Sequence, residues 1–264
     1  MSGRYQRMFA REAAIFGAFV MLGDPGIEES AAILDELVAG GADMIEVGIP
    51  FSDPVADGPV IQAAAVRALA NGATPAACFA LLSAFRTRQP NVPLGILTYA
   101  NLVLARGRDA FYRAARDSGA DSVLVADVPV DEATPFVAAA RAWDVAPVLI
   151  AAANTPPERL CRIARLGQGY TYCVARAGVT GAAQEARFDH AAMLRVLRDE
   201  RAPPPVFGFG ISTPEHVRAA LDAGAAGVIS GSAIVDRVGR GEPVRGFVEA
   251  MKAATRSLCT AGTD

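Results

Sequence analysis

The feature that most constrains the fold of this chain is a repeated alternation of short apolar runs with longer stretches of helical periodicity. The runs fall at residues 15–22, 44–49, 94–99, 122–128, 147–152, 170–175, 206–210 and 227–230. Near-continuous apolar strands separated by helices are typical of a parallel sheet covered on both faces. Eight runs in 264 residues allow about 33 residues for each repeat, the size of one βα unit.

Eight such units predict a (β/α)8 TIM barrel, formed as a single domain over residues 1–264 with extra helices. The segment 58–72 is predicted to be one of these extra helices. Gly40 and Asn71 are expected to end helices, and Thr213 before Pro214 is expected to begin one. A doubly wound open sheet is the alternative, although eight parallel strands would make that sheet unusually wide.

The scarce residue types argue against several kinds of chemistry. The one lysine, Lys252, follows all eight runs, so a Schiff-base lysine at a strand end is not expected. His190 and His216 fall at predicted helix starts, and the four cysteines are far apart without a C-x-x-C spacing, so no metal site is expected. With a net charge of −3 and no long apolar span, we expect a cytoplasmic protein that binds neither nucleic acid nor membrane.

The run at 44–49 contains a carboxylate, Glu46, which is costly to bury among apolar residues. Side chains alternate along a strand, so Ile45 and Val47 are expected to face the helices and Glu46 the barrel interior. Burial would raise the pKa of Glu46, and the group could then hold or deliver a proton near neutrality. A structural, hydrogen-bonded glutamate is the other interpretation.

Active sites of barrels lie at the C-terminal ends of the strands. The loop 50–59 after the second run carries two acids, Asp53 and Asp57, which are functional candidates although both could also be turn residues. Three further polar side chains lie at or near strand ends and are predicted to meet at the same mouth: Tyr99, Asp127 and Tyr172.

Glycines follow the last two runs, at Gly208 and Gly210 and again at Gly231 before Ser232. Barrels commonly bind phosphate at this corner through backbone N–H groups and a short helix N-terminus. The segment 176–185 is long and rich in small residues, as expected of a lid. These residues together indicate an acid/base lyase or isomerase acting on a phosphorylated substrate.

Residues 45–62 read IEVGIPFSDPVADGPVIQ and closely resemble the signature of the tryptophan synthase α subunit family. Further family motifs follow in order: LGDP at 22–25, YAN at 99–101, VADVP at 125–129, GVTG at 178–181, GFGIS at 208–212 and GSAIV at 231–235. The resemblance covers nearly the whole chain. It implies a TIM barrel that cleaves indole-3-glycerol phosphate into indole and glyceraldehyde 3-phosphate, a retro-aldol reaction without metal or cofactor.

The resemblance also implies residue roles. Glu46 matches the acid/base that protonates indole C3 and takes the glycerol hydroxyl proton, and Asp57 matches the carboxylate that bonds the indole N–H. The implied substrate-binding residues are Phe19, Leu97, Tyr99, Leu124, Asp127, Tyr172 and Phe209. The implied phosphate-binding residues are Gly181, Gly210, Gly231 and Ser232.

Asp53, Pro54 and Asn101 match the face that docks the β subunit in an αββα complex. Indole passes to that subunit, which uses pyridoxal phosphate, whereas the α chain itself binds no cofactor. The chain departs from the family at Met21, where threonine is usual, and at Ala18, where proline is usual. Two alternatives stay open: a stand-alone indole-releasing lyase of the same family, and a non-catalytic binding barrel.

Overall fold

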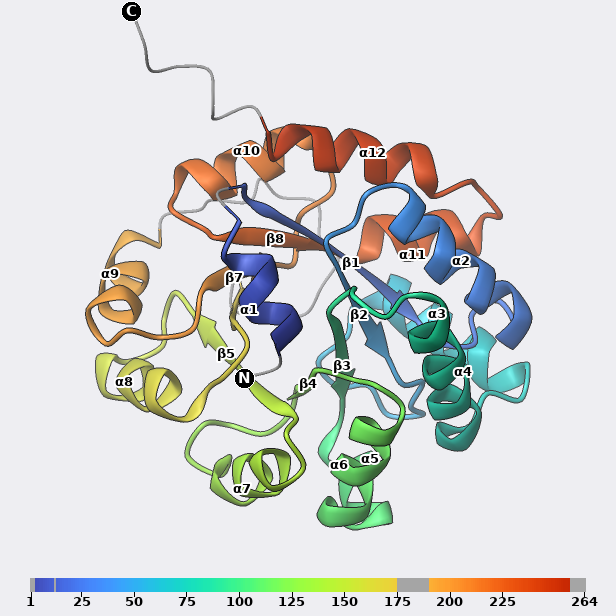
Figure 1. Ribbon diagram of the computed structural model, residues 1–264, viewed down its shortest axis with the longest axis horizontal. Helices are drawn as coiled ribbons and strands as arrows, with labels where there is room; N and C mark the ends of the chain where they lie inside the picture. The colour runs from blue at the N-terminus through green and yellow to red at the C-terminus, as the bar shows by residue number, and fades with distance from the viewer. Residues whose placement is uncertain (1–2, 12, 175–189, 257–264) are drawn as a thin grey trace, which may run out of the picture.

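A computed structural model describes residues 3–11, 13–174 and 190–256. Each strand pairs in parallel with the next, and β1 also pairs with β8, which closes a barrel (Figure 1). The strands are β1 (Ile15–Met21), β2 (Met44–Gly48), β3 (Leu94–Thr98), β4 (Ser122–Val125), β5 (Ala146–Ala152), β6 (Thr171–Val174), β7 (Pro205–Gly208) and β8 (Gly227–Ser230). The predicted TIM barrel is confirmed, and the closure between β1 and β8 excludes the open sheet.

Helices surround the barrel, including the extra helix expected before the third strand. They are α1 (Gly3–Phe9), α2 (Ile27–Ala39), α3 (Pro59–Ala70), α4 (Pro75–Arg88), α5 (Ala100–Arg106), α6 (Arg108–Asp117), α7 (Thr134–Ala142), α8 (Pro157–Leu166), α9 (Ala191–Asp199), α10 (Pro214–Asp222), α11 (Ser232–Gly239) and α12 (Arg245–Ala254). The expected helix ends at Gly40 and Asn71 are confirmed, and the Thr213 hydroxyl caps α10. Among the described residues no single helix is long and apolar enough to cross a membrane; α3 and α4 pass that test only as a pair bent by 98°.

The apolar side chains form two layers, one between strands and helices and one inside the barrel. Ile45 and Val47 belong to the outer layer, whereas Phe19, Met44 and Leu97 belong to the inner one. This alternation confirms the expected orientation of β2. It places the side chain of the intervening Glu46 in the barrel interior.

Two strands end at least two residues earlier than predicted. The fourth ends at Val125 rather than at residue 128, because the amides beyond it turn back, with Val128 N–H donating to the Val125 carbonyl at 3.4 Å. The seventh ends at Gly208 rather than at residue 210, because Phe209 (φ +60°) and Gly210 (φ +75°) are left-handed. A left-handed conformation is unfavourable for a bulky residue, so contacts with the surrounding structure must hold Phe209 in it.

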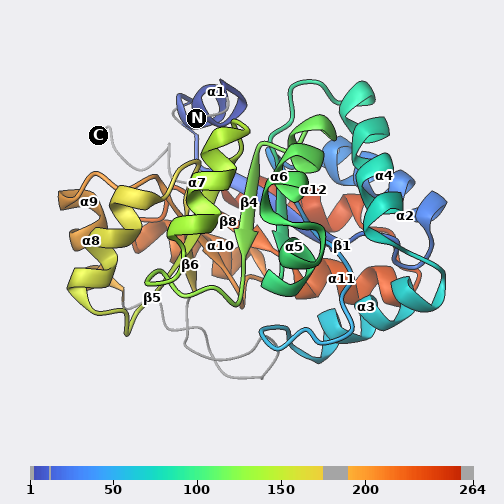
Figure 2. The ribbon, with the colours of Figure 1, turned by 90° about the horizontal axis from the view of Figure 1, so that it is seen from below.

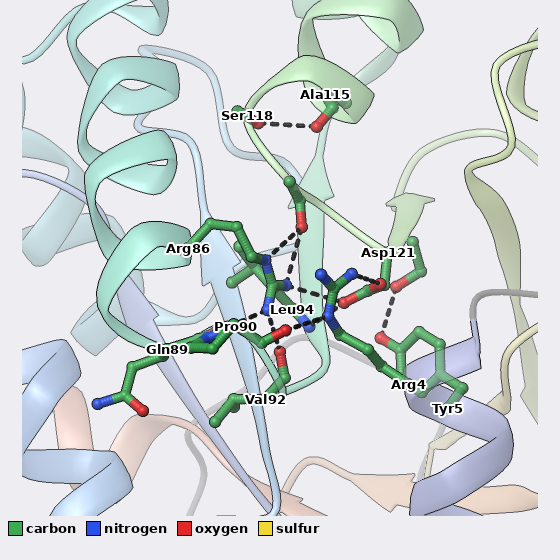
Figure 3. Close-up of polar contacts among 12 residues, drawn as sticks. Arg4, Tyr5, Arg86, Gln89, Pro90, Val92, Leu94, Ala115, Ser118 and Asp121 are labelled. Atoms are coloured by element: carbon green, nitrogen blue, oxygen red, sulfur yellow. Dashed lines mark hydrogen bonds and ion pairs between the residues drawn. The ribbon is translucent and has the colours of Figure 1, made fainter.

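Helix α1 lies across one end of the barrel (Figure 1), opposite the end at which α3 lies (Figure 2). We call the end under α1 the floor and the opposite end the mouth. At the floor the Tyr5 hydroxyl lies 2.8 Å from Ser122 Oγ. The buried Asp121 carboxylate accepts bonds from the guanidinium groups of Arg4 at 2.9 Å and Arg86 at 3.0 Å (Figure 3). The floor is therefore sealed by a helix and an ion-pair network.

Candidate active site

A pocket with about 500 Å³ of empty space opens at the mouth of the barrel. Eight predicted site residues lie on its wall: Phe19, Asp57, Leu97, Tyr172, Phe209, Gly210, Gly231 and Ser232. Sequence reasoning did not single out five others on that wall: Ile61, Ile211, Ser212, Ile229 and Ala233. Each of the five lies in or beside a segment that the prediction had placed at the mouth, so proximity along the chain was the available signal.

One side of the pocket is aromatic and apolar. The rings of Tyr172 and Phe209 meet edge to face, with centroids 5.7 Å apart. Gly208 makes room for this pair, because a Cβ at that position would lie 1.9 Å from the Tyr172 hydroxyl oxygen. With Phe19 and Leu97, these rings form a slot suited to a flat aromatic ligand.

One corner of the pocket is suited to an anion. Gly231 is the N-cap of α11, and Ser232 and Ala233 form its first turn. The first amides of a helix have no acceptor within that helix, and the helix dipole favours negative charge there. Gly210 brings the β7–α10 loop to the same corner, where a glycine backbone allows close approach to a bound group.

Asp57 stands on the pocket wall and is 7% exposed. Burial raises the pKa of its carboxyl, and a hydrogen bond with the Tyr99 side chain opposes that shift. The Tyr99 hydroxyl also accepts the Ala56 amide at 3.2 Å. The structure thus places Tyr99 behind Asp57, where it holds the loop, rather than on the pocket wall.

Glu46 is 1% exposed and lies behind the pocket wall. Its Oε1 accepts a 2.5 Å hydrogen bond from the Tyr170 hydroxyl, while Oε2 has no hydrogen-bond partner among the residues that the structure describes. Burial raises the pKa of Glu46 to about 7, and the bond from Tyr170 opposes that shift. A carboxyl group with this pKa can exchange a proton at neutral pH.

Tyr170 is a residue that sequence reasoning did not single out. It alternates with Tyr172 along the sixth apolar run, and the structure buries both residues. The signal was present in that alternation, which puts both rings on the inner face of the barrel. The pairing with Glu46, 124 residues away along the chain, carried no local signal.

The remaining predicted substrate residues lie elsewhere. Leu124 is buried in the inner layer without reaching the pocket wall. Asp127 is exposed, and its Oδ1 accepts the Ala100 amide at 2.8 Å; it borders a second hollow beside the ends of β4 and β5. Gly181 lies outside the described residues. The structure therefore brings neither Leu124 nor Asp127 to the pocket.

The three predicted partner-docking residues lie on two segments, the loop after β2 and helix α5, that also carry exposed apolar side chains. Asp53 and Asn101 are exposed and Pro54 is half-buried. Val55 follows Pro54 and is 72% exposed, and Leu104 lies on α5 with Asn101 and is 48% exposed. Large apolar side chains exposed to water are typical of interaction surfaces when they form one patch.

The two histidines differ in burial. His216 accompanies the N-cap of α10, whereas His190 is buried and stacks on Phe207 with ring centroids 5.0 Å apart. In the part of the chain that the structure describes, no group of three His, Cys, Asp or Glu side chains is placed to hold a metal ion.

Comparison with known proteins agrees with this geometry. A family model described as "Tryptophan synthase alpha chain" matches residues 5–261. The chain belongs to the tryptophan synthase alpha chain family. A tryptophan synthase alpha chain from Shewanella amazonensis is 52% identical over 264 residues, covering 96% of this chain and 99% of that relative. One from Klebsiella pneumoniae is 51% identical over 266 residues, with the same coverage.

Solved structures of the tryptophan synthase alpha chain family share the fold. A tryptophan synthase subunit alpha from Legionella pneumophila has a TM-score of 0.86 at 26% identity, covering 97% of this chain and 99% of that one. A tryptophan synthase structure from Mycobacterium tuberculosis has a TM-score of 0.86 at 28% identity, covering 97% of each chain. The family resemblance inferred from the sequence motifs is thereby confirmed.

Proposed function

We propose that this chain cleaves indole-3-glycerol phosphate into indole and glyceraldehyde 3-phosphate, as the α subunit of a tryptophan synthase. The observation that carries the proposal is the composition of one pocket. An aromatic slot, an anion-binding helix terminus and a carboxylate share its wall, with a second carboxylate directly behind it. Family membership supports the same reaction.

The two sides of the pocket fit the two ends of this substrate. The indole ring occupies the slot between Phe19, Leu97 and Phe209, and its N–H donates to Asp57. The phosphate accepts hydrogen bonds from the amides at the start of α11. This arrangement places the glycerol carbons between the two ends, beside Tyr172.

The reaction breaks the bond between indole C3 and the first glycerol carbon. Protonated Glu46 gives its proton to C3, and the anionic Asp57 stabilises the resulting indolenine cation. Glu46 then takes the proton of the neighbouring hydroxyl. The carbon–carbon bond breaks, its electron pair restores the aromatic ring, and the carbon that loses it becomes the aldehyde. Glu46 ends in its starting protonation state.

Glu46 must turn from Tyr170 toward the pocket to reach C3, because its carboxylate lies behind the wall. A pKa of about 7 suits both halves of the cycle. The acid can deliver a proton at neutral pH, and its conjugate base is strong enough to accept one.

The partner in this proposal is a tryptophan synthase β subunit in an αββα complex. Asp53, Pro54 and Asn101 form the docking face together with the exposed Val55 and Leu104. Removing these apolar side chains from water would favour association. The chain itself holds no cofactor in this proposal.

The test is indole release from indole-3-glycerol phosphate, with and without a purified β subunit from a relative. We expect weak release that rises when the partner is added. Asp57→Asn should slow cleavage about 100-fold, because an amide cannot neutralise the indolenine cation. Strong release that no partner changes would favour the stand-alone lyase. No release under either condition would overturn the proposed function and favour a binding barrel.

A second measurement addresses the docking face alone. Val55→Asp should weaken binding of the β subunit at least 10-fold while leaving release without the partner unchanged, because it puts a charge on an apolar contact. Val66→Asp is a matched control, since Val66 is 66% exposed on α3 and lies outside the proposed face. Equal binding by both variants and the native chain would contradict this face.

A further inference from the structure

Met21, the last residue of β1, lies on the mouth side of Glu46. It is 4% exposed and pairs in register with Gly48 on β2. A Cβ at Gly48 would lie 2.9 Å from Met21 Cε, 3.0 Å from Met21 Sδ and 3.0 Å from Phe19 Cζ. The thioether therefore fills the space that a side chain at position 48 would occupy.

Glu46 lies two residues before Gly48 on the same inner face of β2, and it pairs in register with Phe19. Its carboxylate bonds to Tyr170, which directly precedes β6 and so lies on the floor side. The thioether lies on the mouth side, because both β1 and β2 run toward the mouth. Glu46 thus lies between Tyr170 on the floor side and Met21 on the mouth side.

We propose that Met21 is a positioning residue for Glu46: its thioether is a displaceable cover that keeps the carboxylate turned toward Tyr170 and away from water until substrate enters. This inference rests on the proposed function for the role of Glu46 in catalysis. Methionine suits such a cover because it is unbranched and changes shape through three rotatable bonds. Gly48 suits it because no side chain obstructs the path of the carboxylate.

The pKa of Glu46 depends mainly on how well water reaches its carboxylate. This access is what the Met21 thioether would control. In the described part of the chain, the titratable groups that interact with Glu46 are three phenols: Tyr5 from α1, Tyr170 just before β6 and Tyr172 in β6. None of these phenols is charged at neutral pH. The raised pKa of Glu46 therefore comes mainly from burial, which removal of the cover would reduce.

The test measures the pH dependence of kcat/KM for indole release in the αβ complex. Met21→Ala and Met21→Thr shorten the cover, whereas Met21→Leu keeps an apolar group of similar volume. Leu22→Ala is the control for lost packing, because Leu22 is fully buried in the outer layer. Glu46→Gln combined with Met21→Ala checks that any pH shift comes from Glu46.

The native enzyme should lose activity as the pH rises through about 7, because protonated Glu46 is the acid. Met21→Ala and Met21→Thr should move that loss about one pH unit lower, since water stabilises the carboxylate. Met21→Leu and Leu22→Ala should leave the pH of this activity loss unchanged. The inference would be overturned if Met21→Ala and Met21→Thr both lost activity at the same pH as the native enzyme. An equal pH shift in Leu22→Ala would also overturn it. If Met21→Ala does not fold, Met21→Thr decides the result.

A second readout needs no turnover and separates this inference from the proposed function. The free energy of unfolding, measured by urea titration from pH 4 to pH 9, reports the pKa of Glu46 in the folded chain. If the native chain releases no indole, the proposed function fails, but the pH range over which stability declines still tests Met21. That range should narrow in Met21→Ala and disappear when Glu46→Gln is added.

Discussion

Two of the buried carboxylates in this barrel, Asp121 and Glu46, have opposite surroundings. At the floor, Asp121 is 2% exposed and accepts bonds from Arg4, Arg86 and a backbone amide. Glu46 is 1% exposed and, within the described ranges, accepts a single bond, from the neutral Tyr170. Burial alone therefore does not distinguish a structural acid from a chemical one. The number and charge of its donors do, because cations fix a carboxylate in its anionic form.

The largest expected effect is on turnover. Glu46→Gln should lower kcat about 1,000-fold, because the amide cannot donate and recover the proton. The nearly isosteric side chain should keep the fold, and stability at pH 8 should rise because no buried carboxylate then needs to be charged. Indole release and urea unfolding of the same preparation check both statements. Residual activity near the native level would show that Glu46 is not the acid/base.

The corresponding change at the floor should affect stability instead. Asp121→Asn should lower the free energy of unfolding by about 3–5 kcal/mol, because it leaves two partly buried guanidinium groups without their anion. Activity per folded molecule should stay within about two-fold of native, because the change lies far from the pocket. Asp35→Asn is the control: its ion pair with Arg88 is 40% exposed on both sides and should contribute under about 1 kcal/mol. A large loss of turnover in folded Asp121→Asn would contradict this division of roles.

The difference between Asp121 and Glu46 also predicts how the free energy of unfolding depends on pH. The pKa of Glu46 is about 7 in the folded chain and near 4.5 when unfolded, so between these values the folded state binds the extra proton. Stability should therefore fall as the pH rises from about 4.5 to 7, by about 3 kcal/mol from this group. Urea titrations of the native chain and of Glu46→Gln isolate the contribution as their difference. A flat difference across this range would show that Glu46 titrates normally.

The smallest expected effect on kcat/KM tests the hydrogen bond that Glu46 accepts from the Tyr170 hydroxyl. Tyr170→Phe removes a hydrogen bond that favours the charged carboxylate, so the pKa of Glu46 should rise further. The alkaline loss of kcat/KM should move upward by less than about one pH unit. Tyr112→Phe is a control, because Tyr112 is equally buried but belongs to the outer layer. A downward shift in Tyr170→Phe would mean that the bond favours the neutral acid.

The barrel was predictable because its signal is periodic and local. Each strand is buried on both faces, so each one appears in the sequence as a continuous apolar run. The inward direction of Glu46 followed from alternation along β2, which β-strand geometry fixes. The ends of β4 and β7 were less predictable, since a turn after Val125 and the left-handed Phe209 depend on contacts with other segments.

Long-range polar contacts had no signal in the sequence. Three aspartates each accept a backbone amide that lies 27 residues earlier: Asp43 from Phe16, Asp121 from Leu94 and Asp127 from Ala100. Asp127 was predicted to bind substrate from its position at a strand end. In the structure its carboxylate holds the start of α5, a use that no local pattern distinguishes from ligand binding.

Because the floor is covered, molecules enter and leave the described pocket at the mouth. Tyr5 is fully buried and its helix lies across the floor (Figure 1), so a molecule formed in the pocket leaves at the mouth, where its precursor entered. The two fragments are therefore released one after the other at the mouth, and the fragment that lies deeper leaves second. A protein seated on the rim would control the order in which they depart.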